Sequence, residues 1–470
     1  MSGSLFLSAY PGYATTGGLD ELRAREYGYL DDRGHVYLDY TGAGLPSRAQ
    51  LAAHADRLRE ECFGNPHSDS PTSRASTSLV ERTRAAVLSY FNASPAEYAV
   101  IFTPNATGAC RLVAEAYPFG PGTDLVLTAD NHNSVNGIRE YAREHGAAVA
   151  YIPPDAAGLR VSSEAVRRVL GRGQGLFAFP AQSNFSGVQH PLAWVPLAQA
   201  YGYQVLLDAA AYVPANRLDL GAVHPDFVPV SWYKVFGYPT GVGCLLARWE
   251  ALARLRRPWF SGGTIKVVSA LGGWHVLAGD ETAFEDGTLN FHAVPEVSVG
   301  MAWIEGIGMK VIHERVTCLT GWLLERLRGL RHSGGEPLVR VYGPWDTDGR
   351  GATVALNFLD PAGGVIDERV VARDAAARNI SLRTGCFCNP GAGEGAFTIP
   401  GDALTGPDAG RDLSIEEYLP IIGLPTGGAV RVSLGLVSNL ADVERFIDFA
   451  AETYLDRAPD HTGLVPRERC

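Results

Sequence analysis

The chain has 470 residues, of which 46% are hydrophobic and 19% are charged, a composition typical of a folded protein and too apolar for disorder. Its formal net charge of −11 argues against nucleic-acid backbones and anionic membranes as main partners. Its apolar runs all fall short of the roughly 18 residues that a membrane span needs. We therefore expect neither nucleic acid nor membrane among its partners.

Seven cysteines are scattered along the chain, in an odd number and without the spacing of a disulfide framework. They are Cys62, Cys110, Cys244, Cys318, Cys386, Cys388 and Cys470. This usage favours a reducing, cytoplasmic setting, in which most thiols are small buried apolar groups. A thiol with a chemical role must be argued for individually.

Short apolar runs alternate with helical stretches between about residues 95 and 250. The strand-like runs are AVIF (99–102), DLVLT (124–128), GLFAFP (175–180), QVLLDAA (204–210), FVPVSW (227–232) and GVGCLLA (241–247). Such alternation is typical of parallel strands joined by crossover helices. We predict an α/β fold with a large, mostly parallel sheet, whose ligands bind at the carboxyl ends of the strands.

The pattern changes after about residue 295, where two long helices are followed by shorter alternating strands and helices. This predicts a large domain over residues 36–295 and a smaller α+β domain over residues 296–456. Residues 1–35 are expected to pack with the small domain, and residues 457–470 to form a tail. Residues 392–428 are rich in Gly and Pro and are predicted to form a long surface loop.

Three chemically informative side chains follow predicted strands of the large domain. Asp208 stands where an apolar run stops, which is a costly place for an unpaired carboxylate. Lys234 follows another apolar run and precedes a Gly-rich stretch, and His132 lies in a third loop. Because ligands bind at the carboxyl ends of strands in such sheets, these residues are candidates for one site.

An anion site is predicted in the segment FTPNATGAC (102–110), which has the pattern of a strand, a turn and a helix. The amides after Asn105, beginning with Ala106, and the hydroxyl of Thr107 then lie at a helix N-terminus, which binds anions without a basic side chain. A phosphate site, a carboxylate, a lysine and a planar imidazole together suit pyridoxal phosphate. In this prediction Asp208 keeps the pyridinium nitrogen protonated, Lys234 binds the cofactor covalently and His132 stacks on its ring.

Several motifs resemble those of the class V, fold-type I pyridoxal-phosphate enzymes. Within that group the chain is similar to cysteine desulfurases and to the aminotransferase-like N-terminal domain of molybdenum cofactor sulfurases. The resemblance covers residues from about 30 to about 450. It is carried by VYLDYTGAG, GNPHS, FTPNATGACRLVAEAYPF, FPAQSNFSG, LLDAAA, SWYKVFGYPTGVG, FEDGTLNF, LRTGCFCNPGA and VRVSLG.

This resemblance implies roles for further residues. Asn184 would contact the ring hydroxyl and the substrate, and Ser231 would join Thr107 in binding the phosphate. Arg383 would bind the substrate carboxylate as a bidentate fork. Thr288 matches a position at which a partner subunit completes the phosphate site, so the resemblance implies a homodimer.

The stretch SLRTGCFCNPG (381–391) contains two cysteines one residue apart. A metal site there lacks a second pair of ligands nearby, and a disulfide across one residue would be strained. A buried pair without a chemical role stays open. The resemblance selects Cys388, five residues after Arg383, as the nucleophile, and leaves Cys386 open as a relay.

The resemblance thus implies a cysteine desulfurase-like enzyme. Lys234 would take the Cα proton of L-cysteine, and the sulfur would pass to Cys388 as a persulfide, leaving alanine. The acceptor would be molybdenum cofactor, another small molecule or a carrier protein. Two alternatives stay open: a pyridoxal-phosphate C–S lyase that does not use Cys388, and an idle scaffold or sulfur-carrier partner that retains the fold.

Three further positions bear on this interpretation. Tyr233 stands where many desulfurases have a histidine before the lysine, and Ala211 stands where many have a glutamine. The form LLDAAA does match the cofactor sulfurases. Arg431 in VRVSLG fits either a surface strand residue or a structural or substrate-side role.

Overall fold

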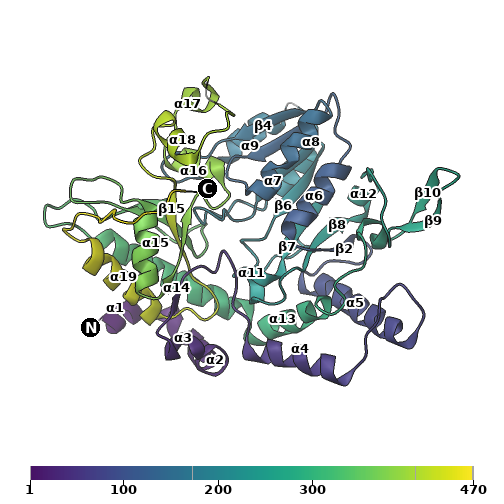
Figure 1. The fold of residues 1–470 in the computed structure, drawn as a ribbon, viewed down its shortest axis with the longest axis horizontal. Coiled ribbons are helices and arrows are strands. Elements are labelled where there is room, and N and C mark those ends of the chain that lie inside the picture. The colour runs from purple at the N-terminus through teal and green to yellow at the C-terminus, as the bar shows by residue number, and fades with distance from the viewer. Residues whose placement is uncertain (1, 172, 408, 468–470) are drawn as a thin grey trace.

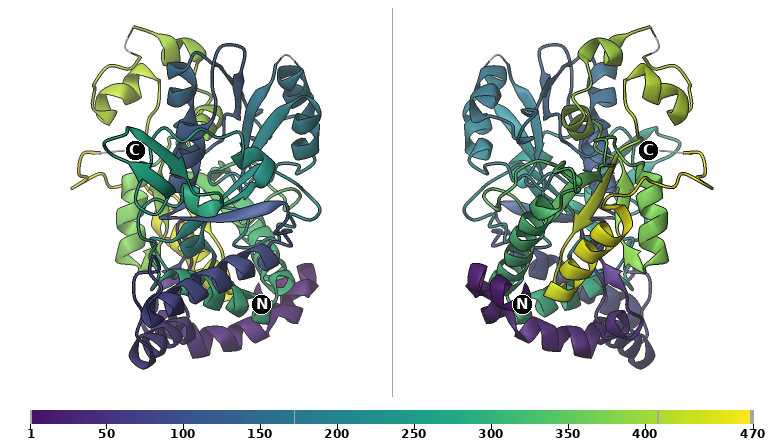
Figure 2. Two further views of the ribbon diagram at one scale, coloured as in Figure 1. Left: turned by 90° about the vertical axis from the view of Figure 1, so that its right-hand side faces the viewer. Right: turned by 90° about the vertical axis from the view of Figure 1, so that its left-hand side faces the viewer.

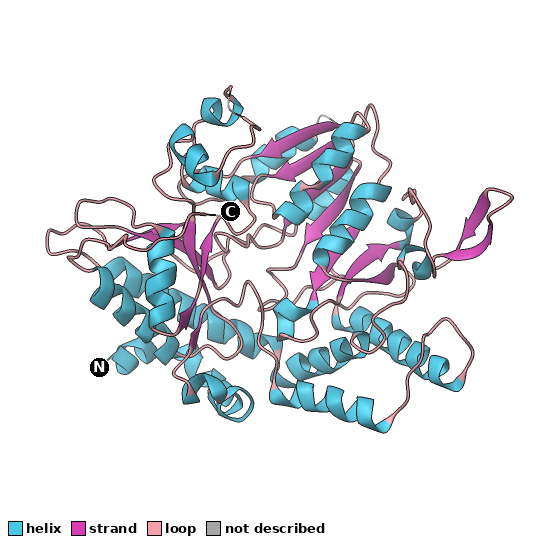
Figure 3. Ribbon diagram, viewed as in Figure 1, coloured by secondary structure: helices cyan, strands magenta, loops and turns pink. Residues whose placement is uncertain are grey.

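Two sheets organise the chain, which we describe from a computed structural model over residues 2–171, 173–407 and 409–467. A large sheet lies on the right of Figure 1 and a smaller one on the left. Figure 3 shows helices on both sides of the large sheet. The predicted α/β class, with a large mostly parallel sheet and a smaller α+β unit, is confirmed.

Within the described residues, seven strands form the large sheet in the order β2, β8, β7, β6, β5, β3, β4. Their bounds are β2 Tyr98–Thr103, β3 Asp124–Thr128, β4 Ala148–Ile152, β5 Gly175–Pro180, β6 Tyr203–Asp208, β7 Phe227–Ser231 and β8 Gly243–Arg248. Strand β8 is antiparallel to both of its neighbours, and the other pairs are parallel. The connection from β7 to β8 contains only the short helix α11 (Trp232–Phe236), so β8 returns antiparallel beside β7.

Both faces of the large sheet are buried, which explains why its strands are almost continuously apolar. Leu125 and Leu127 face one core, whereas Val126 between them faces the other. Helices α6, α7, α8 and α12 contribute to the first core, and α5, α9, α10 and α13 to the second. The bounds of these helices are α5 Pro71–Tyr90, α6 Ala106–Ala116, α7 Asn133–Asn136, α8 Ile138–Glu144, α9 Ser163–Leu170, α10 Trp194–Ala200, α12 Trp249–Leu252 and α13 Val294–Ile307. Helix α4 (Arg48–Glu60) precedes α5 in the chain.

The small sheet is antiparallel, in the order β11, β12, β15, β14. The elements of this unit are α14 Met309–Gly329, β11 Val339–Tyr342, β12 Thr353–Phe358, α15 Glu368–Ala377, β13 Ile380–Ser381, β14 Arg383–Gly385, β15 Ala429–Ser433 and α19 Leu440–Tyr454. The two long helices predicted after residue 295 are α13 and α14. Side chains of α13 and the first turn of α14, through Ile312, join the core of the large sheet, and those of α14 from Val316 on join the small core. The change of core therefore falls within α14, between Ile312 and Val316, whereas the sequence predicts a boundary at residue 295.

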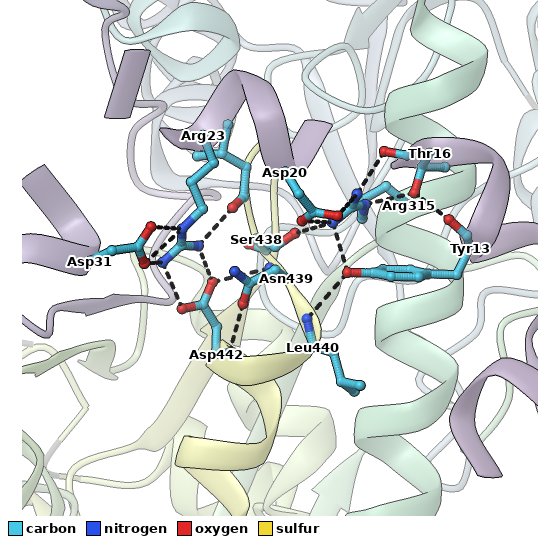
Figure 4. Close-up of polar contacts among 11 residues, drawn as sticks. Tyr13, Thr16, Asp20, Arg23, Asp31, Arg315, Ser438, Asn439, Leu440 and Asp442 are labelled. Atoms are coloured by element: carbon cyan, nitrogen blue, oxygen red, sulfur yellow. Dashed lines mark hydrogen bonds and ion pairs between the residues drawn. The ribbon is translucent and has the colours of Figure 1, made fainter. Parts of the chain in front are cut away.

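The N-terminal segment lies against helices of the small unit. It consists of α1 Ser2–Ala9, η1 Pro11–Thr16, α2 Gly18–Tyr27 and α3 Tyr29–Asp32, followed by β1 Val36–Tyr37, which pairs with β13. Arg315 of α14 is paired with Asp20 at 2.8 Å, and Arg23 is paired with Asp442 of α19 at 2.5 Å (Figure 4). Leu19 of α2 packs in the core of the large sheet, so the segment also contacts the large unit.

The predicted long loop over residues 392–428 is wrong in part, because three short helices form there. They are α16 Pro390–Ala396, α17 Gly401–Thr405 and α18 Ile415–Ile421. The side chain of Asn389 caps α16, and Ser414 and Glu417 form a capping box at α18. The S-x-x-E signature at 414–417 is the sequence signal for α18. Figure 2 shows this helical region and the purple N-terminal helices at opposite ends of the molecule.

The described part of the tail returns to α15. Arg373 donates to the carbonyl oxygens of Asp460 and Thr462, each at 2.9 Å. Arg467 is paired with Glu368 at 2.8 Å. The rest of the predicted tail, with Cys470, lies outside the described residues.

A hairpin of β9 (Ile265–Ser269) and β10 (Trp274–Leu277) projects from the large unit, at the right of Figure 1, and precedes η2 (Glu281–Phe284). Its turn and faces carry exposed apolar side chains, including Val268, Leu271 and Trp274. Among the described helices, none combines the length and the apolar character that a bilayer span requires.

Candidate active site

A cavity of about 160 Å³ lies at the carboxyl ends of β5, β6 and β7. Its wall includes the last residues of these strands, as expected for a parallel sheet. Most of the predicted site residues meet there: Ala106, Thr107, His132, Asn184, Asp208, Ser231 and Lys234. Cys388, Arg383 and Thr288 lie outside this wall.

Lys234 and Asp208 supply opposite charges to the cavity. Asp208 ends β6, and its Oδ1 accepts a hydrogen bond from the amide of Ala210 at 3.0 Å. Lys234 lies in α11, directly after β7. Burial lowers the pKa of Lys234, and the Asp208 carboxylate opposes that shift. A lysine with a lowered pKa provides more neutral amine, the form that attacks a carbonyl or accepts a proton.

His132 is held in one tautomer at the wall of the cavity. Its Nδ1 accepts the backbone N–H of Ser134 at 3.1 Å, so the proton of the neutral ring is on Nε2. Burial, followed by the positive charge of Lys234, lowers the pKa of His132 to about 4. The ring is therefore neutral near pH 7 and suited to stacking rather than to ion pairing.

The N-terminus of α6 forms the anion-binding end of the cavity. Asn105 caps the helix by accepting from Gly108 N at 2.9 Å, and Ala106 N donates to Ser231 Oγ at 2.8 Å. The hydroxyls of Thr107 and Ser134 are hydrogen-bonded at 2.7 Å. Three hydroxyls thus meet at a helix N-terminus, an arrangement that suits a phosphate group.

Arg383 and Arg431 face each other as direct partners across β14 and β15. Asp39 lies between them, with Oδ1 2.8 Å from Nη2 of Arg431 and Oδ2 2.8 Å from Nη2 of Arg383. Arg431 is buried, so the surface alternative for it is wrong. The hydrogen bonds to Asp39 raise the pKa of Arg383.

Cys388 is an exposed free thiol. This rules out a disulfide between Cys388 and Cys386 and shows that Cys388 is not buried. The carbonyl oxygen of Cys388 accepts the backbone N–H of Asn133 at 2.7 Å. Since Asn133 directly follows His132, the cysteine loop is attached to the rim of the cavity.

Thr288 lies apart from the other predicted site residues. It is exposed, accepts a hydrogen bond from Asn65 Nδ2 at 3.2 Å and lines a second cavity of about 410 Å³. Gly108, in the first turn of α6, also borders that second cavity.

Sequence reasoning missed several residues at the site. Ser134 and Gln182 line the cavity, Asp39 pairs with both arginines, and Asn389 is buried beside Cys388. Ser134 follows His132 by two residues, and the others lie inside the quoted motifs VYLDYTGAG, FPAQSNFSG and LRTGCFCNPGA. Their place in or beside these motifs could have marked them as candidate site residues, but their hydrogen-bond and ion-pair partners are mostly distant in the sequence.

Two solved cysteine desulfurases share this fold. One from Thermococcus onnurineus has a TM-score of 0.77 at 24% identity, covering 92% of this chain and 97% of that chain. Cysteine desulfurase CsdA from Escherichia coli has a TM-score of 0.72 at 20% identity, covering 93% of this chain and 99% of that chain. The chain therefore has the fold of the fold-type I pyridoxal-phosphate enzymes.

The profile of the family described as aminotransferase class-V matches residues 36–446. The chain belongs to the class-V aminotransferase family. Molybdenum cofactor sulfurase from Bos taurus is 36% identical over 467 residues, covering 93% of this chain and 52% of that protein. The Solanum lycopersicum protein of the same name is 34% identical over 495 residues, with coverages of 98% and 60%. The chain thus spans little more than half the length of these relatives.

Proposed function

We propose that the protein is a cysteine desulfurase that moves sulfur from L-cysteine to Cys388 and releases alanine. The observation that carries this proposal is the attachment of an exposed free thiol to the rim of the cavity, through the 2.7 Å hydrogen bond from Asn133 N to the carbonyl of Cys388. A thiol in that place can reach a substrate held over Lys234 and remains open to an acceptor outside.

The residues of the cavity fit pyridoxal phosphate. Lys234 would hold it covalently, Asp208 would pair with its ring nitrogen and His132 would stack on its ring. Ala106, Thr107 and Ser231 would bind its phosphate, and Asn184 would contact its ring hydroxyl. When bound, the cofactor withdraws electrons from the substrate and so makes the Cα proton acidic.

The side chains of the protein supply the remaining steps. Arg383, together with Arg431, would hold the substrate carboxylate, and the Lys234 amine would take the Cα proton. The Cys388 thiolate then attacks the substrate sulfur. A sulfur–sulfur bond forms as the carbon–sulfur bond breaks, and the carbon fragment keeps the electron pair, takes up a proton and leaves as alanine.

The acceptor of the sulfur is proposed from the relatives. Proteins called molybdenum cofactor sulfurases match over most of this chain, which supports molybdenum cofactor or another biosynthetic acceptor, small molecule or protein. A persulfide carrier operates in a reducing compartment, and we propose the cytoplasm.

We also propose a homodimer in which Thr288 completes the cavity of the partner. Its position in a separate cavity, away from Lys234 of its own chain, supports this assembly. So do the exposed apolar side chains of the β9–β10 hairpin, since apolar patches of this kind mark interaction surfaces.

The test is incubation of the cofactor-loaded protein with L-cysteine, with alanine release and intact mass measured before and after reduction. We expect a reductant-sensitive gain of one sulfur that disappears in Cys388→Ala. Cys62→Ala is the matched control, because Cys62 is also an exposed free thiol. Turnover that continues unchanged in Cys388→Ala would favour the C–S lyase, which needs Lys234 but not this thiol. A protein without cofactor absorbance would favour the scaffold alternative.

A further inference from the structure

The loop that carries Cys388 has an unusual backbone. Phe387 and Cys388 both have positive φ angles, of 57° and 53°, in the left-handed region that side chains other than glycine rarely adopt. Two consecutive residues in this region require contacts that hold them there, and such backbone outliers concentrate at functional sites. The contacts around the two residues show what holds them.

Three segments hold this loop, two of them by hydrogen bonds to its backbone. Asn133 N donates to the carbonyl of Cys388 at 2.7 Å, and Asn184 Nδ2 donates to the carbonyl of Phe387 at 2.9 Å. The guanidinium of Arg431 also lies over the Phe387 ring, with its carbon 4.9 Å from the centroid. The loop is thus attached to two neighbours of the cofactor cavity and to the substrate-side arginine.

Asn389 joins these attachments through one buried amide. Its Nδ2 donates to the carbonyl oxygen of Asp130 at 2.7 Å and to Oδ1 of Asn184 at 2.8 Å. Its Oδ1 accepts the backbone N–H of Ala392 at 3.2 Å and so caps α16. Asn389 is fully buried, and both hydrogens of its amide are used.

The contact with Asn184 links the nucleophile to the cavity. Asn184 lines the cavity, and its amide is shared between the carbonyl of Phe387 on one side and Asn389 on the other. Without the Asn389 donor, the buried Oδ1 of Asn184 would lose a partner, and its amide would be free to rotate away from Phe387. The left-handed backbone at Cys388 would then lose its support.

We propose that Asn389 is a positioning residue, which fixes the Cys388 thiol relative to the cofactor cavity through Asn184. It acts on the transfer of sulfur to Cys388 and not on proton removal by Lys234. This inference rests on the proposed desulfurase activity for its kinetic part, and on the loop contacts alone for its structural part. The competing explanation is that Asn389 only caps α16.

Asn389→Ser separates the two explanations. Serine is a good N-cap and can still accept from Ala392 N, but it lacks the amide that donates to Asp130 and Asn184. Asn439→Ala is the control, since Asn439 caps α19 and accepts from Asp442 N at 3.0 Å, in the small unit. Asn389→Asp keeps the cap acceptor and serves as the second variant if the serine protein folds poorly.

The kinetic experiment compares two reactions of the cofactor-loaded enzyme. Exchange of the Cα proton of L-alanine with deuterated solvent reports on Lys234, and alanine release from saturating L-cysteine reports on sulfur transfer. In Asn389→Ser we expect alanine release to fall by about 10- to 100-fold, because displacement of a nucleophile slows the step in which it attacks. The rate of proton exchange should stay within about twofold of the wild type. Equal losses in both reactions, or no loss in either, would overturn the proposal.

The structural experiment does not depend on the reaction. Hydrogen exchange of the backbone amides over residues 387–393 should become at least about tenfold faster in Asn389→Ser and stay unchanged in Asn439→Ala. Unchanged exchange in Asn389→Ser would show that Asn389 does not fix the loop. If the wild-type enzyme places no sulfur on Cys388, the proposed function fails, and the hydrogen exchange still decides whether Asn389 holds the loop.

Discussion

Arg383 and Arg431 are direct cross-strand partners, and both guanidinium groups contact the carboxylate of Asp39. Like charges placed opposite each other destabilise a sheet unless a counter-ion lies between them. One aspartate and two arginines leave a net single positive charge at this edge of the site. That charge suits a substrate with one carboxylate.

Removal of the Asp39 carboxylate should destabilise the fold, because Arg431 would stay buried without its counter-ion. For Asp39→Ala we expect the free energy of unfolding in urea to fall by about 3 kcal/mol. Asp31→Ala is the control: Asp31 is exposed, and its partner Arg23 keeps Asp442, so the loss should stay below about 1 kcal/mol. Equal losses in the two variants would contradict the role assigned to Asp39.

Lys234 should be the only lysine that binds the cofactor. The chain has lysines at three positions, and the other two are Lys266 and Lys310. After borohydride reduction of the loaded enzyme, peptide mass analysis should find the cofactor on the peptide with Lys234 alone. Lys234→Ala should lose alanine release by at least about 10³-fold, while Lys266→Ala stays active. Cofactor on another lysine would refute the assignment.

Acid should weaken the cofactor-free protein partly through His132. Its pKa is about 4 in the folded state, against about 6.5 when unfolded, so between these values the unfolded chain binds the extra proton. The stability therefore falls as the pH is lowered from about 6.5 to 4, by at most about 1.4 kcal/mol per pH unit from this group. His132→Gln should show a correspondingly smaller slope over this range in urea titrations. An identical slope in both proteins would exclude a lowered pKa.

Subunit mixing tests whether Thr288 serves the partner. Thr288→Ala and Lys234→Ala should each be inactive at a cofactor concentration too low to load the threonine variant. In a mixed dimer, one cavity has both changes and the other has neither. Random exchange of subunits should therefore restore about a quarter of the wild-type activity. No recovery after exchange, verified by mass, would mean that Thr288 acts within its own chain.

Much of the cavity could be predicted because its residues follow apolar strands. Asp208 ends β6 and Lys234 comes directly after β7, so a strand prediction places both at one edge of the sheet. The N-terminus of α6 was visible from the strand, turn and helix pattern around Asn105. In each case the local sequence decides the position, and the parallel sheet brings the positions together.

The remaining site residues depend on contacts between distant segments. Asp39 reaches Arg431 because it forms a bridge to Ser433 of β15, and Asn389 reaches Asn184 across a large separation in sequence. Neither spacing nor composition encodes such pairs. The helices α16 and α18 were missed for a different reason: their N-caps, Asn389 and Ser414, lie just before and within the Gly- and Pro-rich residues 392–428.

The N-terminal helices have a consequence for how the chain is made. Arg23 is tied to Asp442, 419 residues later in the sequence, and Leu440 N donates to Tyr13 (Figure 4). A ribosome releases residues 1–35 long before α19 exists, so Arg23 and Tyr13 lack these partners until α19 has been made. Domains emerging first usually fold first, but the contacts of Arg23 and Tyr13 must wait for α19. Synthesis of α19, rather than of the N-terminal helices, therefore sets when these contacts can form.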